Sequence, residues 1–261
     1  MFRLTLIIAF ILIISSCSSH KNPKNPNDKL VLIQGSMLNG AKKSLHIQKI
    51  GKECLVTIDT VVINNENHFN ILIAIDLPGF YSVSNEKGHS IMFPVYGNDT
   101  VTIKGDYADL NKYELSGSEE LLQINLLHQK TTEFLKKVDE FARITNDSIE
   151  SPNYTDIKQK INNQYHSSFE QFRDFSEKFI EKNQGSLASL LALSNQLGPE
   201  FYVFHPVKDM SVFLRVDSAL MKSWPETEAV QALHRQMLII QNQQRSNRDS
   251  LYKNSKNDYQ Q

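Results

Sequence analysis

The spacing of apolar residues changes once along this chain, near Ser116-Gly117-Ser118. Before this point large apolar residues occupy every second position, as in Phe69 to Asp76, which indicates strands with one buried face. After it they recur every three or four positions, as in helices that bury one stripe. Strands followed by helices predict an α+β fold. We expect an N-terminal antiparallel β-sandwich or open barrel followed by a C-terminal helical bundle.

The predicted β-module covers residues 29–116. Its short runs of Val, Ile, Leu and Phe are separated by Gly, Pro, Asn and Asp, without intervening helices. Asn39-Gly40 lies between the runs 30–33 and 44–47 and suits the positive φ angles of a tight turn. The sequence therefore predicts that these two runs form a hairpin.

The predicted helical region covers residues 117–241. Ser118 is followed by Glu119 and Glu120, a pattern typical of a capped helix start. Apolar periodicity then predicts five helices, around residues 122–141, 157–179, 187–193, 212–220 and 230–240. Residues 242–261 are dominated by Gln, Asn, Ser and Lys, which predicts a polar tail that is frayed or disordered.

The first residues are typical of an export signal. Arg3 supplies positive charge, and Leu4–Ile14 is an apolar run shorter than the roughly 20 residues of a membrane-spanning helix. Ile14-Ser15-Ser16-Cys17 resembles a bacterial lipobox, in which the cysteine becomes the lipidated N-terminus. Residues 1–16 are thus a predicted lipoprotein signal peptide. The alternatives are an ordinary cleaved secretion signal and an uncleaved short anchor.

Residues 17–28 then become a lipidated cysteine and a polar tether, which reaches roughly 35 Å when extended. This predicts a protein in the cell envelope of a Gram-negative bacterium, held to a membrane by lipid and facing the periplasm. Lys and Arg total 28 against 29 Asp and Glu, so the charge balance does not predict a basic surface for binding nucleic acid.

The chain has two cysteines, and acylation of Cys17 would leave Cys54 as the only thiol. That excludes an intramolecular disulfide and any Cys-x-x-Cys redox or zinc pair. Cys54 precedes an apolar run, where a small buried side chain and a reactive thiol are both open interpretations. No hydrolase, phosphate-loop or metal-ligand motif occurs, and the histidines are scattered. The sequence therefore predicts no enzyme, cofactor or metal site.

One short pattern recurs: Asp, then Ser or Thr, then an apolar residue, beginning at Asp59, Asp99, Asp147, Asp217 and Asp249. It resembles the acceptor triplet of a general O-glycosylation system for exported proteins. Ser148, Ser218 and Ser250 are the candidate acceptors, with helix caps or ordinary surface residues as the alternative.

The order of several segments resembles a known family. They are Asp59 to Ile63, Phe69-Asn70-Ile71, Phe80 to Val83, Gly97 to Asp106, Leu115 to Ser118 and, in the helical region, Asn183 to Leu193. This order is similar to the N-terminal β-module and helical linker of thioredoxin-like thiol–disulfide oxidoreductase lipoproteins. The thioredoxin domain with its Trp-Cys-x-x-Cys site has no counterpart here, so the resemblance assigns no catalytic residue.

Two functions follow as hypotheses, and a degenerate paralogue with no retained activity is the remaining alternative. The first is a non-catalytic envelope lipoprotein that binds an envelope protein or glycan through its β-module or helices. The second is a redox accessory that works with a separate thioredoxin-like oxidoreductase, with Cys54 able to form a mixed disulfide.

Overall fold

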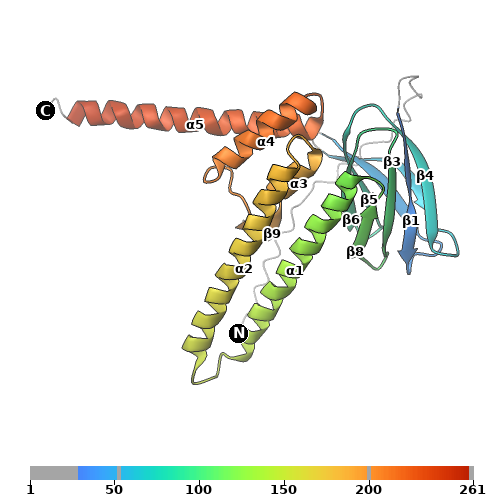
Figure 1. Ribbon diagram of the computed structural model, residues 1–261, viewed down its shortest axis with the longest axis horizontal. Coiled ribbons are helices and arrows are strands. Elements are labelled where there is room, and N and C mark those ends of the chain that lie inside the picture. The colour runs from blue at the N-terminus through green and yellow to red at the C-terminus, as the bar shows by residue number, and fades with distance from the viewer. Residues whose placement is uncertain (1–28, 52–53, 199–200, 259–261) are drawn as a thin grey trace.

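The computed structural model describes residues 29–51, 54–198 and 201–258, with side chains up to residue 247 (Figure 1). The predicted signal peptide, Cys17 and the tether lie outside the described residues. Eight strands come first and the long helices follow, so the α+β order predicted from the change of apolar period is confirmed. Among the described residues, no helix combines the length and apolar character required to cross a bilayer.

The β-module consists of two four-stranded sheets, ordered β4-β1-β7-β8 and β3-β2-β5-β6. The strands are β1 (Lys29–Leu38), β2 (Ser44–Ile50), β3 (Leu55–Val62), β4 (His68–Ile75), β5 (Gly79–Ser84), β6 (Ser90–Val95), β7 (Thr100–Asp106) and β8 (Asp109–Ser116). Alternate residues of both sheets point into a shared core, where Ile33 of β1 and Ile47 of β2 are fully buried.

The predicted hairpin at Asn39-Gly40 is wrong. Asn39 does adopt a positive φ of 59°, as its turn chemistry predicts. However, β1 pairs with β4 and β7, whereas β2 pairs with β3 and β5. The loop therefore carries the chain from one sheet to the other. The β1–β7 pair is also parallel, so the expected all-antiparallel pairing is corrected at this position.

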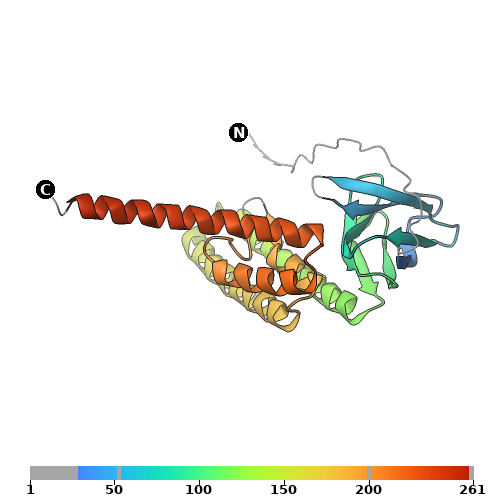
Figure 2. The same ribbon diagram turned by 90° about the horizontal axis from the view of Figure 1, so that it is seen from above.

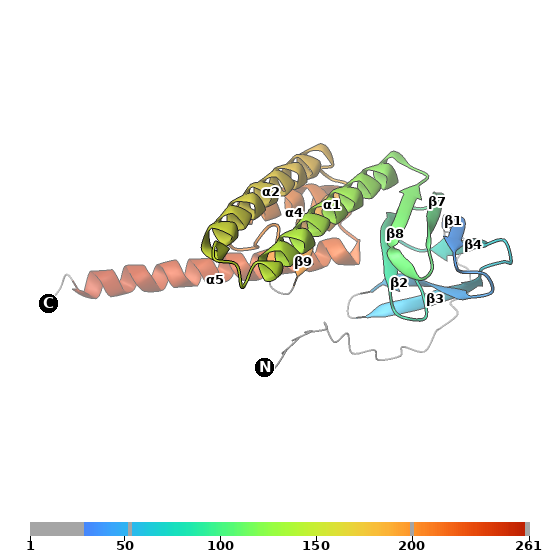
Figure 3. The same cartoon turned by 90° about the horizontal axis from the view of Figure 1, so that it is seen from below.

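The helical region contains α1 (Glu119–Asp147), α2 (Tyr154–Lys182), α3 (Leu187–Leu193), α4 (Met210–Ser223) and α5 (Glu228–Asp258). The predicted start of α1 is confirmed, because the Ser118 hydroxyl accepts a hydrogen bond from the Leu121 N–H at 3.2 Å. Helices α1 and α2 lie side by side as an antiparallel pair (Figures 1 and 3). Their aromatic residues pack together, with the rings of Phe134 and Phe172 stacked at 5.1 Å.

Two features of this region differ from the sequence expectation. Between α3 and α4, where the sequence predicted no element, two short strands pair antiparallel, β9 (Gln196–Gly198) and β10 (Phe201–Tyr202). Helix α5 also does not end near residue 241. It continues to Asp258 and extends beyond the other helices (Figure 2). Residues 242–258 include neither Gly nor Pro, so no residue in this polar stretch interrupts the helix.

Candidate interaction surface

The β9–β10 hairpin presents aromatic side chains to solvent. Phe201 is 37 % exposed and Tyr202 is 43 % exposed, although both residues are large and apolar. Phe201 packs on α2, where its ring centroid lies 5.4 Å from that of Phe169 and 6.3 Å from that of Tyr165. The partly exposed ring of Phe201 therefore packs against the aromatic rings of Tyr165 and Phe169 on α2.

The segment after β10 continues this surface. The ring of Tyr202 meets that of His205 edge-on at 6.3 Å. Val207, two residues further, is 49 % exposed. The ring of Phe201 thus contacts α2, and the ring of Tyr202 contacts His205. We call Phe201, Tyr202, His205 and Val207 the hairpin surface.

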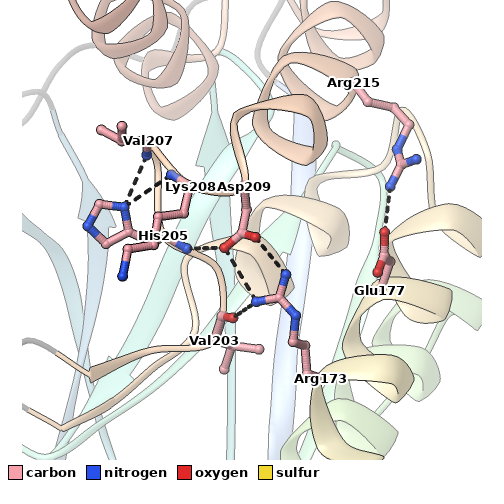
Figure 4. Close-up of polar contacts among 8 residues, drawn as sticks. All are labelled: Arg173, Glu177, Val203, His205, Val207, Lys208, Asp209 and Arg215. Carbon is pink, nitrogen blue, oxygen red and sulfur yellow. Dashed lines mark hydrogen bonds and ion pairs between the residues drawn. The ribbon is translucent and has the colours of Figure 1, made fainter. Parts of the chain in front are cut away.

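Arg173 of α2 holds this segment in place (Figure 4). Its Nη1 donates to the Val203 carbonyl at 2.7 Å, and its Nη2 donates to Asp209 Oδ1 at 2.6 Å. The guanidinium also lies over the ring of Phe204, 5.0 Å from its centroid. The Arg173 guanidinium thus joins α2, the non-strand segment after the hairpin and the start of α4.

Asp209 is the acidic partner of Arg173, and we call this pair the Arg173–Asp209 clamp. Its Oδ2 accepts a hydrogen bond from the His205 N–H at 2.7 Å, which closes the loop before α4. Burial alone would raise the pKa of Asp209. The hydrogen bonds from Arg173 and from the His205 N–H outweigh burial, so the pKa lies below its ordinary value. The carboxylate therefore stays ionised at neutral pH and keeps the Arg173 pairing intact.

A second, weaker ion pair joins the same helices. Arg215 of α4 lies 3.5 Å from the Glu177 carboxylate of α2, and both side chains are more than one third exposed. Solvent screens such a pair, so we attribute the fixed position of the hairpin surface mainly to Arg173 and Asp209.

An open groove of about 770 Å³ between α1 and α2 is a second candidate contact site. Charged, amide and hydroxyl side chains such as Lys137, Asp156 and Asn163 dominate its lining, with Phe141 as the aromatic member. Such side chains are well solvated on an ordinary helix surface, whereas exposed rings on a fixed support are not. The hairpin surface is therefore the stronger candidate for contact with a partner.

The predicted site residues do not converge on this surface. Cys54 is partly buried in the turn before β3, and its carbonyl accepts a hydrogen bond from the Gly51 N–H at 3.0 Å. Ser148 lies in the turn after α1, where its hydroxyl donates to the Ile144 carbonyl at 2.7 Å. Ser250 lies within α5, beyond the side chains that the structure describes.

Ser218 is exposed on α4, but the aspartate of its triplet is not. Asp217 is 6 % exposed, and its Oδ2 lies 2.9 Å from Nδ1 of His234 on α5. The aspartate of another triplet, Asp99, accepts hydrogen bonds from the N–H groups of Tyr96 and Gly97 and so shapes a turn. Within the described residues, no three side chains of His, Cys, Asp or Glu form a group suited to a metal ion.

Sequence reasoning did not identify the hairpin surface. Phe201 and Tyr202 lie between two predicted helices, and the adjacent aromatic residues after Gly198-Pro199 were the one available signal. Arg173 and Asp209 lie 36 residues apart, and no local pattern marks them as partners.

Comparison with known proteins gave no match. No family model corresponds to this chain, and neither a curated protein nor a solved structure resembles it significantly. The resemblance to the oxidoreductase lipoproteins stays a prediction, and the function has to be argued from the residues themselves.

Proposed function

We propose that this chain is a lipid-anchored interaction module of the Gram-negative cell envelope. In this proposal Cys17 carries the lipid, and the β-sandwich and helical bundle face the periplasm. The hairpin surface contacts an envelope protein or glycan, and the module performs no catalysis of its own.

The exposed aromatic pair, Phe201 and Tyr202, is the observation that carries this proposal. Large rings in water are unfavourable unless a ligand covers them, and aromatic side chains are enriched at binding surfaces. Their support by Arg173 and Asp209 limits the conformational entropy lost on binding. A fixed aromatic platform can stack on a sugar ring or pack against apolar side chains of a protein.

Affinity capture from native envelopes tests the proposal. Full-length lipidated protein is used as bait, and the Phe201→Ala/Tyr202→Ala variant is compared with it. Ile239→Ala on α5 is the matched control, since Ile239 is 58 % exposed but lies outside the hairpin surface. Loss of a central aromatic contact costs about 2 kcal/mol or more, which lowers affinity roughly 30-fold.

We expect wild type and Ile239→Ala to capture the same ligand and the double variant to lose it. Protease treatment of the captured material distinguishes a protein ligand from a glycan. Equal capture by the double variant, or nothing above the bead control for wild type, would contradict the proposal.

A further inference from the structure

A leucine patch lies on the outer face of the sheet β4-β1-β7-β8. Even-numbered residues of β1 point outward, because Val31 and Ile33 between them are fully buried. Leu30 is 45 % exposed and Leu72 of β4 is 58 % exposed. The strand register sets Leu32 opposite Leu72 and Leu30 opposite Ala74. We call Leu30, Leu32, Leu72 and Ala74 the leucine patch.

The patch occupies one end of this face and not the whole of it. Next to the patch the outward β1–β4 pairs are polar, with Gln34 opposite Asn70 and Ser36 opposite His68. Leu38, at the far end of β1, is again apolar and 65 % exposed. On β7, Thr100 lies beside Leu32, and Thr102 accepts a hydrogen bond from the Gln34 amide at 3.4 Å. A polar stretch therefore separates the leucine patch from Leu38 on this sheet face.

The apolar end is where the chain enters the β-module from the N-terminal segment. Lys29 is the first described residue and belongs to β1, directly before Leu30. Cys17 precedes Lys29 by twelve residues, a length that extends at most about 40 Å. A lipid on Cys17 would therefore limit the distance between this end of the sheet and the membrane surface to about 40 Å.

The charges at the rim are compatible with a lipid headgroup region. Lys29 adds a positive charge beside the patch, and its Nζ contacts the Tyr96 carbonyl at 3.5 Å. Asp76, just beyond β4, is paired with Lys49 at 2.7 Å. In the preceding segment Lys21 and Lys24 outnumber Asp28. Contact with anionic headgroups would therefore be favourable near the patch.

The size of the patch favours a lipid surface over a second copy of the chain. Three leucines and one alanine can bury only a few hundred Å², far below the roughly 1,200 Å² of a stable protein interface. A surface anchored by lipid needs no such area, because the anchor already holds the protein at the bilayer. Strands β1 and β4 also lie at the opposite end of the molecule from the C-terminus of α5 (Figure 1).

We propose that the leucine patch rests in the headgroup region of the membrane that holds the lipid. This inference depends on the proposed anchor at Cys17. The patch fixes the orientation of the tethered protein, with β1 and β4 against the bilayer and α5 directed away from it.

Site-directed spin labelling of the full-length lipidated protein tests this contact. A nitroxide is attached at Ala74→Cys within the patch or at Asn70→Cys on the polar end of the same strand, both in a Cys54→Ser background. The protein is reconstituted in phosphatidylethanolamine vesicles with a minor fraction of phosphatidylglycerol. Flotation of the vesicles confirms anchorage, and collision with oxygen or with a water-soluble nickel chelate reports the depth of the label.

We expect the label at 74 to favour oxygen several-fold more than the label at 70. Leu30→Ser/Leu72→Ser should abolish this difference. Leu38→Ser should preserve it, because Leu38 is 65 % exposed on the same face of β1 but at its far end.

Three results would overturn the inference. Equal aqueous exposure of both labels on floated protein would show that the patch does not touch lipid, while leaving the anchor intact. Shielding of position 74 from both reagents would assign the patch to a protein contact, from a second copy or from the tether. Failure of the protein to float would remove the anchor and this inference together.

Discussion

Tyr96, which follows the last residue of β6, is hydrogen-bonded to Glu120 in the first turn of α1. The phenol donates to Oε1 at 2.6 Å and accepts a hydrogen bond from the Leu187 N–H of α3 at 3.0 Å. The Glu120 carboxylate also accepts from the Ser186 hydroxyl and from the Ala188 N–H. This contact therefore links the β-module, α1 and α3 at one point and fixes how the two parts are oriented.

The first prediction concerns the Tyr96 hydroxyl. Tyr96→Phe removes one donor from the Glu120 carboxylate and one acceptor from the Leu187 N–H. We expect the free energy of unfolding to fall by about 1 to 3 kcal/mol, because partly buried polar groups lose partners. Urea denaturation followed by circular dichroism measures it. Tyr202→Phe, which changes an exposed tyrosine, is the control, and an equal effect of both variants would contradict the assignment.

The second prediction concerns alkaline pH. Burial and then the nearby Glu120 carboxylate raise the pKa of Tyr96, and burial with the Asp76 charge raises that of Tyr81. Both phenols keep their protons in the fold, whereas those of the unfolded chain titrate near pH 10. The free energy of unfolding should therefore fall as pH rises above about 10. Urea titrations at about pH 8 and pH 11 measure this loss of unfolding free energy. We expect the loss to be smaller in Tyr96→Phe than in wild type. An equal loss in the two proteins would refute the role of the Tyr96 phenol.

The third prediction concerns the Arg173–Asp209 clamp. A double-mutant cycle with Arg173→Gln and Asp209→Asn should give a coupling free energy of about 1 to 3 kcal/mol, since the contact at 2.6 Å is charge-assisted and mostly buried. The same cycle on the more exposed pair Arg215 and Glu177 should give less than about 1 kcal/mol. Thermal or urea unfolding supplies the values. Equal coupling in the two cycles would show that the clamp has no special role.

The fourth prediction concerns O-glycosylation. Ser148 lies in the turn after α1 beside an exposed Asp147, whereas Asp217 before Ser218 is buried against His234. An enzyme that reads the whole triplet can reach the first site and not the second. Intact-mass analysis of protein from the native host should show added mass that Ser148→Ala removes and Ser218→Ala retains. A wild-type mass equal to polypeptide plus lipid would rule this out.

The fifth prediction separates the proposed function from the redox alternative. Cys54 is partly buried in the turn before β3 and lies outside the hairpin surface. We expect Cys54→Ser to leave ligand capture and the redox phenotype of the host unchanged. Loss of a mixed disulfide with a thioredoxin-like protein in this variant would instead favour the accessory role.

The sequence pattern predicted where helices and turns lie better than it predicted which strands pair. Apolar spacing and the Ser118 cap located α1, because helix periodicity and capping depend on neighbouring residues. The turn at Asn39 was also identified from local chemistry. Its strands nevertheless joined different sheets, since β1 pairs with residues of β7 that lie 68 positions later. A local turn signal contains no information about such a distant partner.

The candidate surface was harder to predict for the same reason. Strands β9 and β10 are three and two residues long, too short for a periodic pattern. The burial of Asp217 depends on His234 of the next helix, and the clamp at Asp209 depends on Arg173 of a preceding one. Such contacts emerge only when helices pack together. The polar stretch after residue 241 is helical without an apolar stripe, so composition alone suggested a tail.

Labelling growing cells of the native host with radioactive palmitate tests the central claim most directly. We predict that the wild-type polypeptide incorporates the label, that Cys17→Ser does not, and that Cys54→Ser incorporates it normally. An unlabelled wild-type chain, or equal labelling of Cys17→Ser, would contradict the lipid anchor on which the proposed function rests.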